Sequence, residues 1–234
     1  MIDKFEIKNM ETGKNLSDFN VKPDDYYALA RPEMLEFIPK NSKIILDVGC
    51  GYGHFGKLVK DKLNSIVWGI ELDTLAGEYA KSNLDNVIIG DVFKIIETLP
   101  KQYFDCIVFN DILEHLIDPY TLLVKIKSLL TNSGVIVCSI PNVRYIGNLK
   151  RLILNKQWKY EDAGILDKTH LRFFTKKSII ETLEILDFDL ITIKGINQVR
   201  TVKFKLLNVI SLGSLSDTKY LQFACVAKPK LTNF

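Results

Sequence analysis

The chain has 234 residues and carries 31 Lys and Arg against 28 Asp and Glu, which gives a formal net charge of +3. This length suits one large α/β domain, and a charge so nearly balanced gives no reason to expect a nucleic-acid partner. No apolar run reaches the length of a membrane span, and the first residues carry acids and lack the apolar core of an export signal.

The number and spacing of the cysteines and histidines limit the expected compartment and metal binding of the protein. The four cysteines form no C-x-x-C pair, and three of them lie in or beside apolar segments; they are Cys50, Cys106, Cys138 and Cys225. We therefore expect reduced core thiols and a cytoplasmic protein. With three histidines, none of them in a ligand pair, the spacing predicts no metal.

In chain order, residues 1–40 predict an amino-terminal arm and a cap helix, the helix spanning 24–37. Strand and helix signals then alternate. Strands are predicted near 44–48, 66–70, 86–89, 104–109, 134–140, 189–194 and 220–227, and helices near 54–63, 74–82, 92–98, 118–130 and 178–186. The strands are nearly continuous apolar runs, as expected when both faces of a sheet are buried. This alternation predicts a doubly wound, mostly parallel sheet.

Two helix starts carry capping signals. Asp118 followed by Pro119 suits a helix N-terminus, with the acid as the cap and the proline in the first turn. Ser178 suits a second one, with Glu181 at the position of a capping box.

Two long insertions interrupt the regular pattern of this single domain, at 141–175 and 197–216. The first contains a basic amphipathic stretch over 144–154, and insertions of this length are usually functional. The second predicts an amphipathic helix over 199–212, with four apolar residues on one face: Val202, Leu206, Val209 and Ile210. Packing on the sheet or on a partner subunit is the simpler interpretation, and docking on a membrane surface is the alternative.

The most informative segment is the glycine-rich loop after the first strand. That strand ends in Asp47, and the loop then carries Gly49, Gly51 and Gly53 before a helix begins near residue 54. Glycines let the backbone approach a ligand closely, and a helix N-terminus offers free N–H groups. The segment therefore predicts a nucleotide-type site at the carboxyl end of a parallel strand.

Acids at three successive strand ends indicate which nucleotide. Residues 51–56 also fit the dinucleotide fingerprint G-x-G-x-x-G, but Asp47 would repel a pyrophosphate. S-adenosylmethionine (SAM) has no phosphate and carries a sulfonium and an ammonium group, which a carboxylate favours. Glu71 follows about twenty residues later, where an acid takes ribose hydroxyls, and Asp91 is placed to accept from the adenine amino group.

The chain resembles class I SAM-dependent methyltransferases over roughly residues 26–194. The matching blocks are Asp47-Val48-Gly49-Cys50-Gly51-Tyr52-Gly53, Gly69-Ile70-Glu71-Leu72-Asp73, Gly90-Asp91-Val92 and the segment from Phe104 to Leu116. The resemblance implies a seven-stranded, Rossmann-like methyltransferase sheet with helical lid insertions, and SAM bound across the strand ends. The cofactor-binding residues that we predict are Arg31, Asp47, Gly49, Cys50, Gly51, Gly53, Glu71, Leu72, Asp91, Val92, Asn110 and Asp111.

Two histidines are the candidates for catalysis. His115 follows the fourth predicted strand, and in similar methyltransferases this residue lies close to the cofactor. His170 alternates with apolar neighbours, so that it and Arg172 could share one face of an extended segment. Either histidine could remove a proton from the acceptor or have only a structural role.

The blocks from Ser139 to Tyr145 and from Leu166 to Thr175 resemble those of small-molecule methyltransferases of bacterial surface-polysaccharide and metabolite pathways. In those relatives the second block folds over the acceptor. The acceptor-binding residues that we predict are Asn142, Arg144, Tyr145, His170 and Arg172, and the two arginines would suit an anionic acceptor.

The resulting hypothesis is SAM-dependent methyl transfer to a small molecule, most simply to a hydroxyl of a sugar or a phosphorylated metabolite, by an enzyme that could be a homodimer. An RNA or protein acceptor is the first alternative, although no large basic face or RNA-binding module is evident. A non-enzymatic protein on a retained fold and an NAD-dependent oxidoreductase are further alternatives, which the intact loop and Asp47 disfavour.

Overall fold

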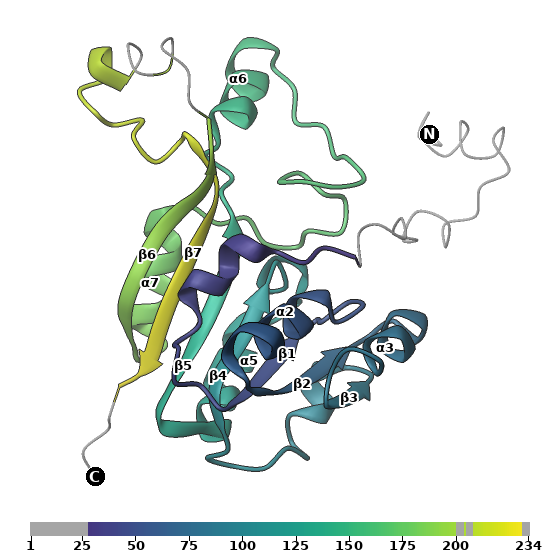
Figure 1. Cartoon of the computed structure of the whole chain (residues 1–234). Coiled ribbons are helices and arrows are strands. Elements are labelled where there is room, and N and C mark those ends of the chain that lie inside the picture. Colours follow the sequence, from purple (N-terminus) through teal and green to yellow (C-terminus); the bar gives the residue numbers. More distant parts are fainter. Residues whose placement is uncertain (1–27, 200–203, 205–207, 231–234) are drawn as a thin grey trace, which may run out of the picture.

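The computed structural model describes residues 28–199, 204 and 208–230. One seven-stranded sheet runs through the molecule in the order β3-β2-β1-β4-β5-β7-β6 (Figure 1). The strands are β1 (Ile44–Val48), β2 (Ile66–Glu71), β3 (Asn86–Ile89), β4 (Phe104–Asn110), β5 (Leu130–Pro141), β6 (Phe188–Gln198) and β7 (Tyr220–Pro229). Strands β1 to β5 pair in parallel, and β7 is antiparallel to both of its neighbours. The predicted mostly parallel sheet is confirmed.

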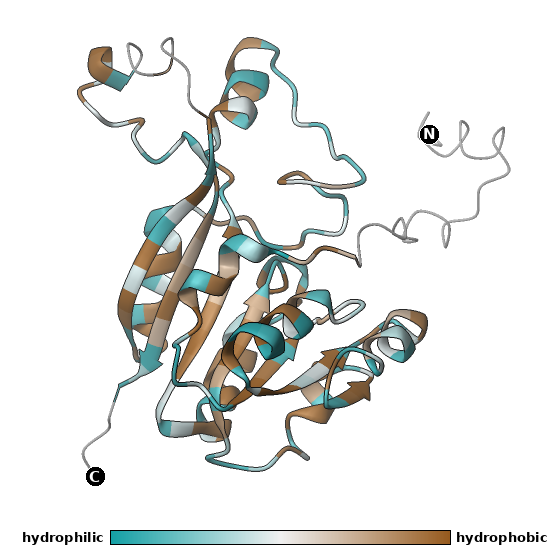
Figure 2. Cartoon of the chain, viewed as in Figure 1, coloured by the Kyte–Doolittle hydropathy of each residue, from teal (hydrophilic) through white to brown (hydrophobic). Residues whose placement is uncertain are grey.

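Helices cover both faces of this sheet. In chain order they are η3 (Pro32–Phe37), α2 (His54–Leu63), α3 (Thr74–Ala80), α4 (Val92–Ile95), η4 (Leu113–His115), α5 (Pro119–Ile126), η5 (Lys127–Leu129), α6 (Ile146–Leu154) and α7 (Lys176–Ile185). Figure 2 shows that the strands are mostly apolar while the helices alternate between apolar and polar residues. This pattern is expected of a sheet that is buried on both sides.

Two apolar cores hold the three layers together. One face of the sheet packs on η3, α2 and α3 through residues such as Met34, Phe55 and Val59. The other face packs on α4, α5 and α7, with Leu123 and Leu183 among the contacts. Because side chains of one strand alternate between the faces, each strand contributes to both cores and fixes the layers relative to one another.

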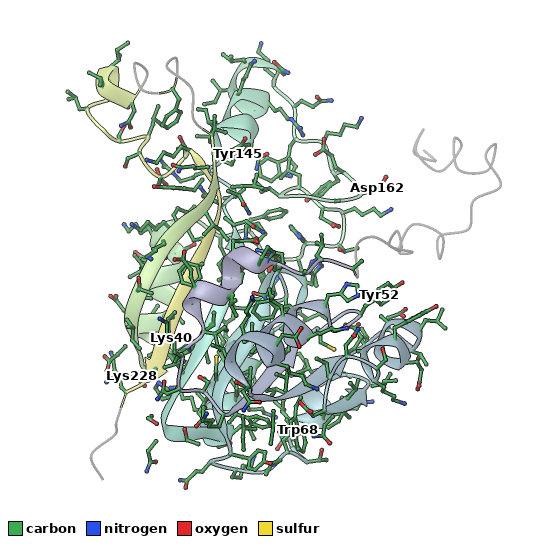
Figure 3. The ribbon with its side chains drawn as sticks, in the orientation of Figure 1. Lys40, Tyr52, Trp68, Tyr145, Asp162 and Lys228 are labelled. Atoms are coloured by element: carbon green, nitrogen blue, oxygen red, sulfur yellow. The ribbon has the colours of Figure 1, made fainter. Side chains whose placement is uncertain are left out.

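The two insertions lie together beyond the carboxyl ends of the strands. Helix α6 and residues 208–219 occupy the top of the view in Figure 1, and Tyr145 lies there at the start of α6, far from Trp68 at the other end of the sheet (Figure 3). The Ile146 N–H donates to the Thr218 carbonyl at 2.8 Å. We call residues 142–174 with 208–219 the upper lobe.

Three local predictions need correction or remain open. Residues 28–31 are not helical, and only the 3₁₀ turn η3 follows them; a proline at the first position of η3 disfavours helix in the residue before it. The N-cap of α7 is Thr175 rather than Ser178, and Ser178 closes the capping box where Glu181 was expected. Of the predicted helix over 199–212, Phe204 and residues 208–210 are helical, while 200–203 and 205–207 lie outside the described residues.

All four cysteines are free and buried, as predicted. Within the described ranges, the structure has no helix of the length and apolar character needed to cross a membrane.

Candidate active site

A cleft of about 710 Å³ opens at the carboxyl ends of β1 to β4. Strands β2 and β4 lie on opposite sides of β1, so the cleft lies where the strand order reverses, which is the usual ligand position in open α/β sheets. Its volume is in the range of small-molecule sites. Its lining includes eleven of the twelve residues predicted to bind a cofactor: Arg31, Asp47, Gly49, Cys50, Gly51, Glu71, Leu72, Asp91, Val92, Asn110 and Asp111. His115 also lines it.

The glycine loop between β1 and α2 forms the floor of the cleft. Gly49, Gly51 and Gly53 have φ angles of 72°, 53° and 77°, which side chains disfavour. A Cβ added at Gly49 would lie 2.0 Å from Ile112, so this position needs glycine for space as well as for conformation. Gly53 is the N-cap of α2 and does not line the cleft. Tyr52, labelled in Figure 3, packs on the Tyr79 ring of α3.

Two carboxyl groups are buried beneath and beside this loop. Glu71, at the end of β2, accepts from the Gly51 N–H at 2.8 Å and from the Asp73 N–H at 2.9 Å. Burial raises the pKa of Glu71, although the two backbone donors oppose the shift. Burial, with the negative charge of Glu71 nearby, raises the pKa of Asp47 to about 8. Such a pair strongly favours a cationic ligand, because a positive charge would relieve the cost of ionising both groups.

The third and fourth strand ends supply further polar groups. Asp91 caps α4 by accepting from the Phe93 N–H at 2.9 Å. Both polar atoms of the Asn110 side-chain amide are buried and have no hydrogen-bond partner within the part of the chain that the structure describes. Buried amides are normally satisfied, so this cleft-lining amide indicates a ligand that would supply the partners.

Arg31 and Asp111 face each other across the rim of the cleft. Their side chains form an ion pair, and Arg31 also binds Glu33, Ser139 and Gln222. Asp111 accepts from Gln222 at 2.7 Å and from Ser139 at 3.0 Å. Both Arg31 and Asp111 have positive φ angles, and such backbone strain is common at functional sites. Arg31 therefore joins the segment before η3 to β5 and β7 at the edge of the cleft.

The two candidate histidines are brought together from distant parts of the sequence. Their ring centroids lie 4.6 Å apart. His115 lines the cleft, and its Nδ1 lies 3.0 Å from Thr169 Oγ1 and 3.3 Å from the Thr169 carbonyl. His170 lies behind it, buried, with Nδ1 3.0 Å from the Ile165 carbonyl.

Glu114, between Leu113 and His115 in η4, was not predicted as a site residue. It is 1% exposed, and burial raises its pKa to about 8. Its Oε1 lies 3.9 Å from His170 Nε2. The Glu114 carbonyl accepts from the Leu171 and Arg172 N–H groups at 2.8 and 3.1 Å, which ties η4 to the first insertion.

The other residues predicted to bind the acceptor do not line the cleft. Asn142 is fully buried and donates to the carbonyls of Asp217 and Tyr220, each at 3.0 Å. Arg144 forms a two-point ion pair with Asp217, at 2.9 and 3.2 Å. Asn142 and Arg144 therefore link the two insertions, and Tyr145 is the N-cap of α6.

Arg172 donates to the Ile117 carbonyl at 2.6 Å and stays outside the cleft. Among the described residues of the two insertions, only Thr169 lines the cleft. Sequence reasoning did not single out Thr169, although it directly precedes His170.

Comparison with known proteins identifies the family. A family profile described as a methyltransferase domain matches residues 24–193. The chain belongs to this methyltransferase family, and its sheet order and cleft are those of class I SAM-dependent methyltransferases. It is 32% identical over 111 residues to a ubiquinone biosynthesis O-methyltransferase of Glaesserella parasuis serovar 5 (strain SH0165), a match that covers 43% of this chain and 46% of that protein. The chain spans about half the length of the curated relatives it matches.

Solved structures support the same fold. A SAM-dependent methyltransferase from Archaeoglobus fulgidus has a TM-score of 0.64 and 19% identity, and the match covers 97% of this chain and all of that one. The plantazolicin methyltransferase BpumL, solved with S-adenosylhomocysteine (SAH), has a TM-score of 0.57 and 20% identity, with 98% of this chain and 92% of that one covered.

Proposed function

We propose that the protein transfers the methyl group of SAM to a hydroxyl oxygen of a small-molecule acceptor. The observation that carries the proposal is the cleft itself, which is lined by the buried acids Asp47 and Glu71 and by Asn110, whose side-chain amide has no hydrogen-bond partner in the described part of the chain. A cation with several hydrogen-bonding groups fits this set, whereas a pyrophosphate does not, because buried carboxylates repel it.

Each residue has a binding task in this proposal. Asp47 favours the positive charges of the cofactor, Glu71 accepts from ribose hydroxyls, and the Asn110 amide binds polar edges of the ligand. Bound SAM supplies a methyl group on a leaving group that is already activated. The protein must therefore align the acceptor, exclude water and deal with the acceptor proton.

His115 is the residue best placed to act on that proton. It is the histidine that lines the cleft, and Thr169 holds its Nδ1. His170 packs against it from behind and positions its ring. The sequence proposed both histidines for catalysis and His170 also for acceptor binding. We keep His115 as the group beside the acceptor and assign His170 a positioning role.

For the acceptor we propose a sugar or a phosphorylated metabolite of bacterial glycan or secondary-metabolite synthesis. The resemblance of the 139–145 and 166–175 blocks supports this choice, and the curated relatives named as O-methyltransferases support oxygen as the acceptor atom. The arginines proposed for an anionic acceptor, Arg144 and Arg172, bind protein groups instead. We therefore assign acceptor recognition to the cleft around His115 and Thr169.

The test is calorimetric titration of the purified protein with SAM, SAH and NAD. We expect micromolar binding of SAM and SAH and no binding of NAD. Glu71→Ala should weaken SAM binding by about 1–3 kcal/mol, the range for a lost hydrogen bond to a charged group. Glu78→Ala is the matched control, since Glu78 is exposed on α3 and pairs with Lys81. Binding of NAD alone, or an unchanged SAM affinity in Glu71→Ala, would contradict the proposal.

A further inference from the structure

The cluster of Glu114, His115 and His170 has the composition of a metal site. Each residue offers one ligand atom, and these atoms all lie within 4.8 Å of one another. The residues come from η4 and from the first insertion, which are joined by the backbone hydrogen bonds from Leu171 and Arg172 to Glu114. The cluster is therefore held by the fold on both sides.

Glu114 gives an independent reason to expect a cation. Its side chain is 1% exposed, and neither carboxylate oxygen has a hydrogen-bond partner among the residues that the structure describes. A buried carboxylate in this condition is costly unless a cation is near. The positive charge of Arg31, on the rim of the cleft, acts on Glu114, but the Arg31 guanidinium is already bound to Asp111 and Glu33.

Hydrogen bonds through Nδ1 orient both histidine rings. The Ile165 carbonyl can only accept, so His170 carries its proton on Nδ1. Thr169 Oγ1 donates to Asp167 at 2.8 Å, so it accepts from His115 Nδ1, as the Thr169 carbonyl also does. Metal-binding histidines characteristically donate their other N–H to a carbonyl or carboxylate network in this manner.

The spacing also fits a shared ion better than a direct hydrogen bond. His170 Nε2 and Glu114 Oε1 are 3.9 Å apart, too far for a hydrogen bond. Two ligand atoms that are each about 2.0–2.2 Å from one ion lie between about 3 and 4.4 Å apart. The separation is therefore within the span of one coordination sphere.

We propose that Glu114, His115 and His170 bind a first-row divalent cation such as Mn²⁺ or Zn²⁺ at the wall of the methyl-transfer cleft. Two imidazoles with one carboxylate leave coordination positions open and favour such ions over Mg²⁺, which prefers oxygen ligands. Because His115 lines the cleft, the open positions face the reacting groups. This site replaces the expectation, drawn from sequence spacing, that the chain binds no metal.

The role of the cation rests on the proposed function. When the acceptor hydroxyl binds to the cation, the pKa of the hydroxyl falls, and its proton leaves to the solvent. The oxygen then forms a bond to the methyl carbon as the S–CH₃ bond breaks, and the electron pair of that bond stays on sulfur to give SAH. In this arrangement His115 holds the cation beside the acceptor hydroxyl, and this role takes the place of the direct proton transfer proposed above for His115.

The test measures metal binding directly. Untagged protein is dialysed against chelator, and Mn²⁺ binding is followed by loss of the electron paramagnetic resonance signal of free Mn²⁺, with Zn²⁺ titrated by calorimetry. We expect one ion per chain and binding at least 10-fold weaker in Glu114→Gln and in His115→Gln. Thr169→Ala, which removes the hydroxyl behind His115, should weaken binding about 10-fold.

His54→Gln is the matched control, because His54 is the remaining histidine of the chain and binds the Ala28 carbonyl away from the cluster. Circular dichroism establishes that each variant is folded, and His115→Gln decides the question if the buried Glu114→Gln does not fold. Absence of binding to the wild-type protein, or equal binding by wild type and His115→Gln, would overturn the site. Binding of Mn²⁺ without binding of SAM would support the site and refute the methyltransferase proposal.

Discussion

Asp47 is a buried carboxyl group, and among the residues that the structure describes no cation pairs with it. Its pKa is raised to about 8 because it is cut off from water and lies near Glu71. When folding raises the pKa of a carboxyl group, the free energy of unfolding is highest below the pKa of the unfolded state, near 4. It then falls as the pH rises through the pKa of the folded state, about 8. The apoprotein should therefore become less stable across this interval.

The prediction at this scale concerns Asp47→Asn. The wild-type free energy of unfolding should fall with pH between 5 and 8, and Asp47 should contribute up to about 1.4 kcal/mol per pH unit of that slope. In Asp47→Asn this part of the slope should vanish, which urea denaturation at several pH values measures. SAM affinity of the wild type should rise over the same interval, because the cationic ligand favours the ionised carboxylate. Identical slopes in the two proteins would refute the assigned pKa.

At the scale of elements, α7 shows how a helix start is decided by structure rather than by composition. Thr175 accepts from the Ser178 N–H at 3.1 Å, and the Ser178 hydroxyl accepts from the Thr175 N–H at 2.9 Å. The helix therefore begins two residues earlier than the sequence predicted, and Glu181 is left to pair with Lys177 on the surface.

Thr175→Ala should lower the free energy of unfolding by about 1 kcal/mol, because it removes the side chain that caps α7. Glu181→Ala should change it by no more than about 0.5 kcal/mol, since an exposed pair contributes little. Chemical denaturation of the two variants compares these values. A larger effect from Glu181→Ala would favour the cap that the sequence predicted.

For the whole molecule, the Arg144–Asp217 ion pair joins the two insertions above the cleft. Arg144→Ala should make the upper lobe more sensitive to limited proteolysis while leaving SAM affinity unchanged, because Arg144 does not line the cleft. Arg151→Ala is the control, since Arg151 pairs with Glu161 inside the first insertion and leaves the junction intact. Equal sensitivity of the two variants, or weaker SAM binding in Arg144→Ala, would contradict this role.

The sequence predictions were accurate where local interactions decide the structure and failed where contacts between distant segments decide it. The strands and the glycine loop could be predicted because burial on two faces and positive φ angles leave local signatures, as in Ile44–Val48 and Gly49. Arg144 and Arg172 were predicted as acceptor ligands, but in the structure they bind Asp217 and the Ile117 carbonyl. These partners are distant in the sequence, so the sequence around each arginine does not reveal them. Glu114 was missed for the same reason, since only the meeting of η4 with residues 165–172 gives it its neighbours.

The reversed direction of β7 has an evolutionary consequence. Because β6 ends and β7 begins at the cleft end of the sheet, residues 199–219 form a connection whose length the sheet does not constrain. Long insertions in such loops cost little free energy. Descendants of this chain could therefore exchange this segment for another while keeping the glycine loop and its acids, so that the upper lobe would diverge faster than the cofactor cleft.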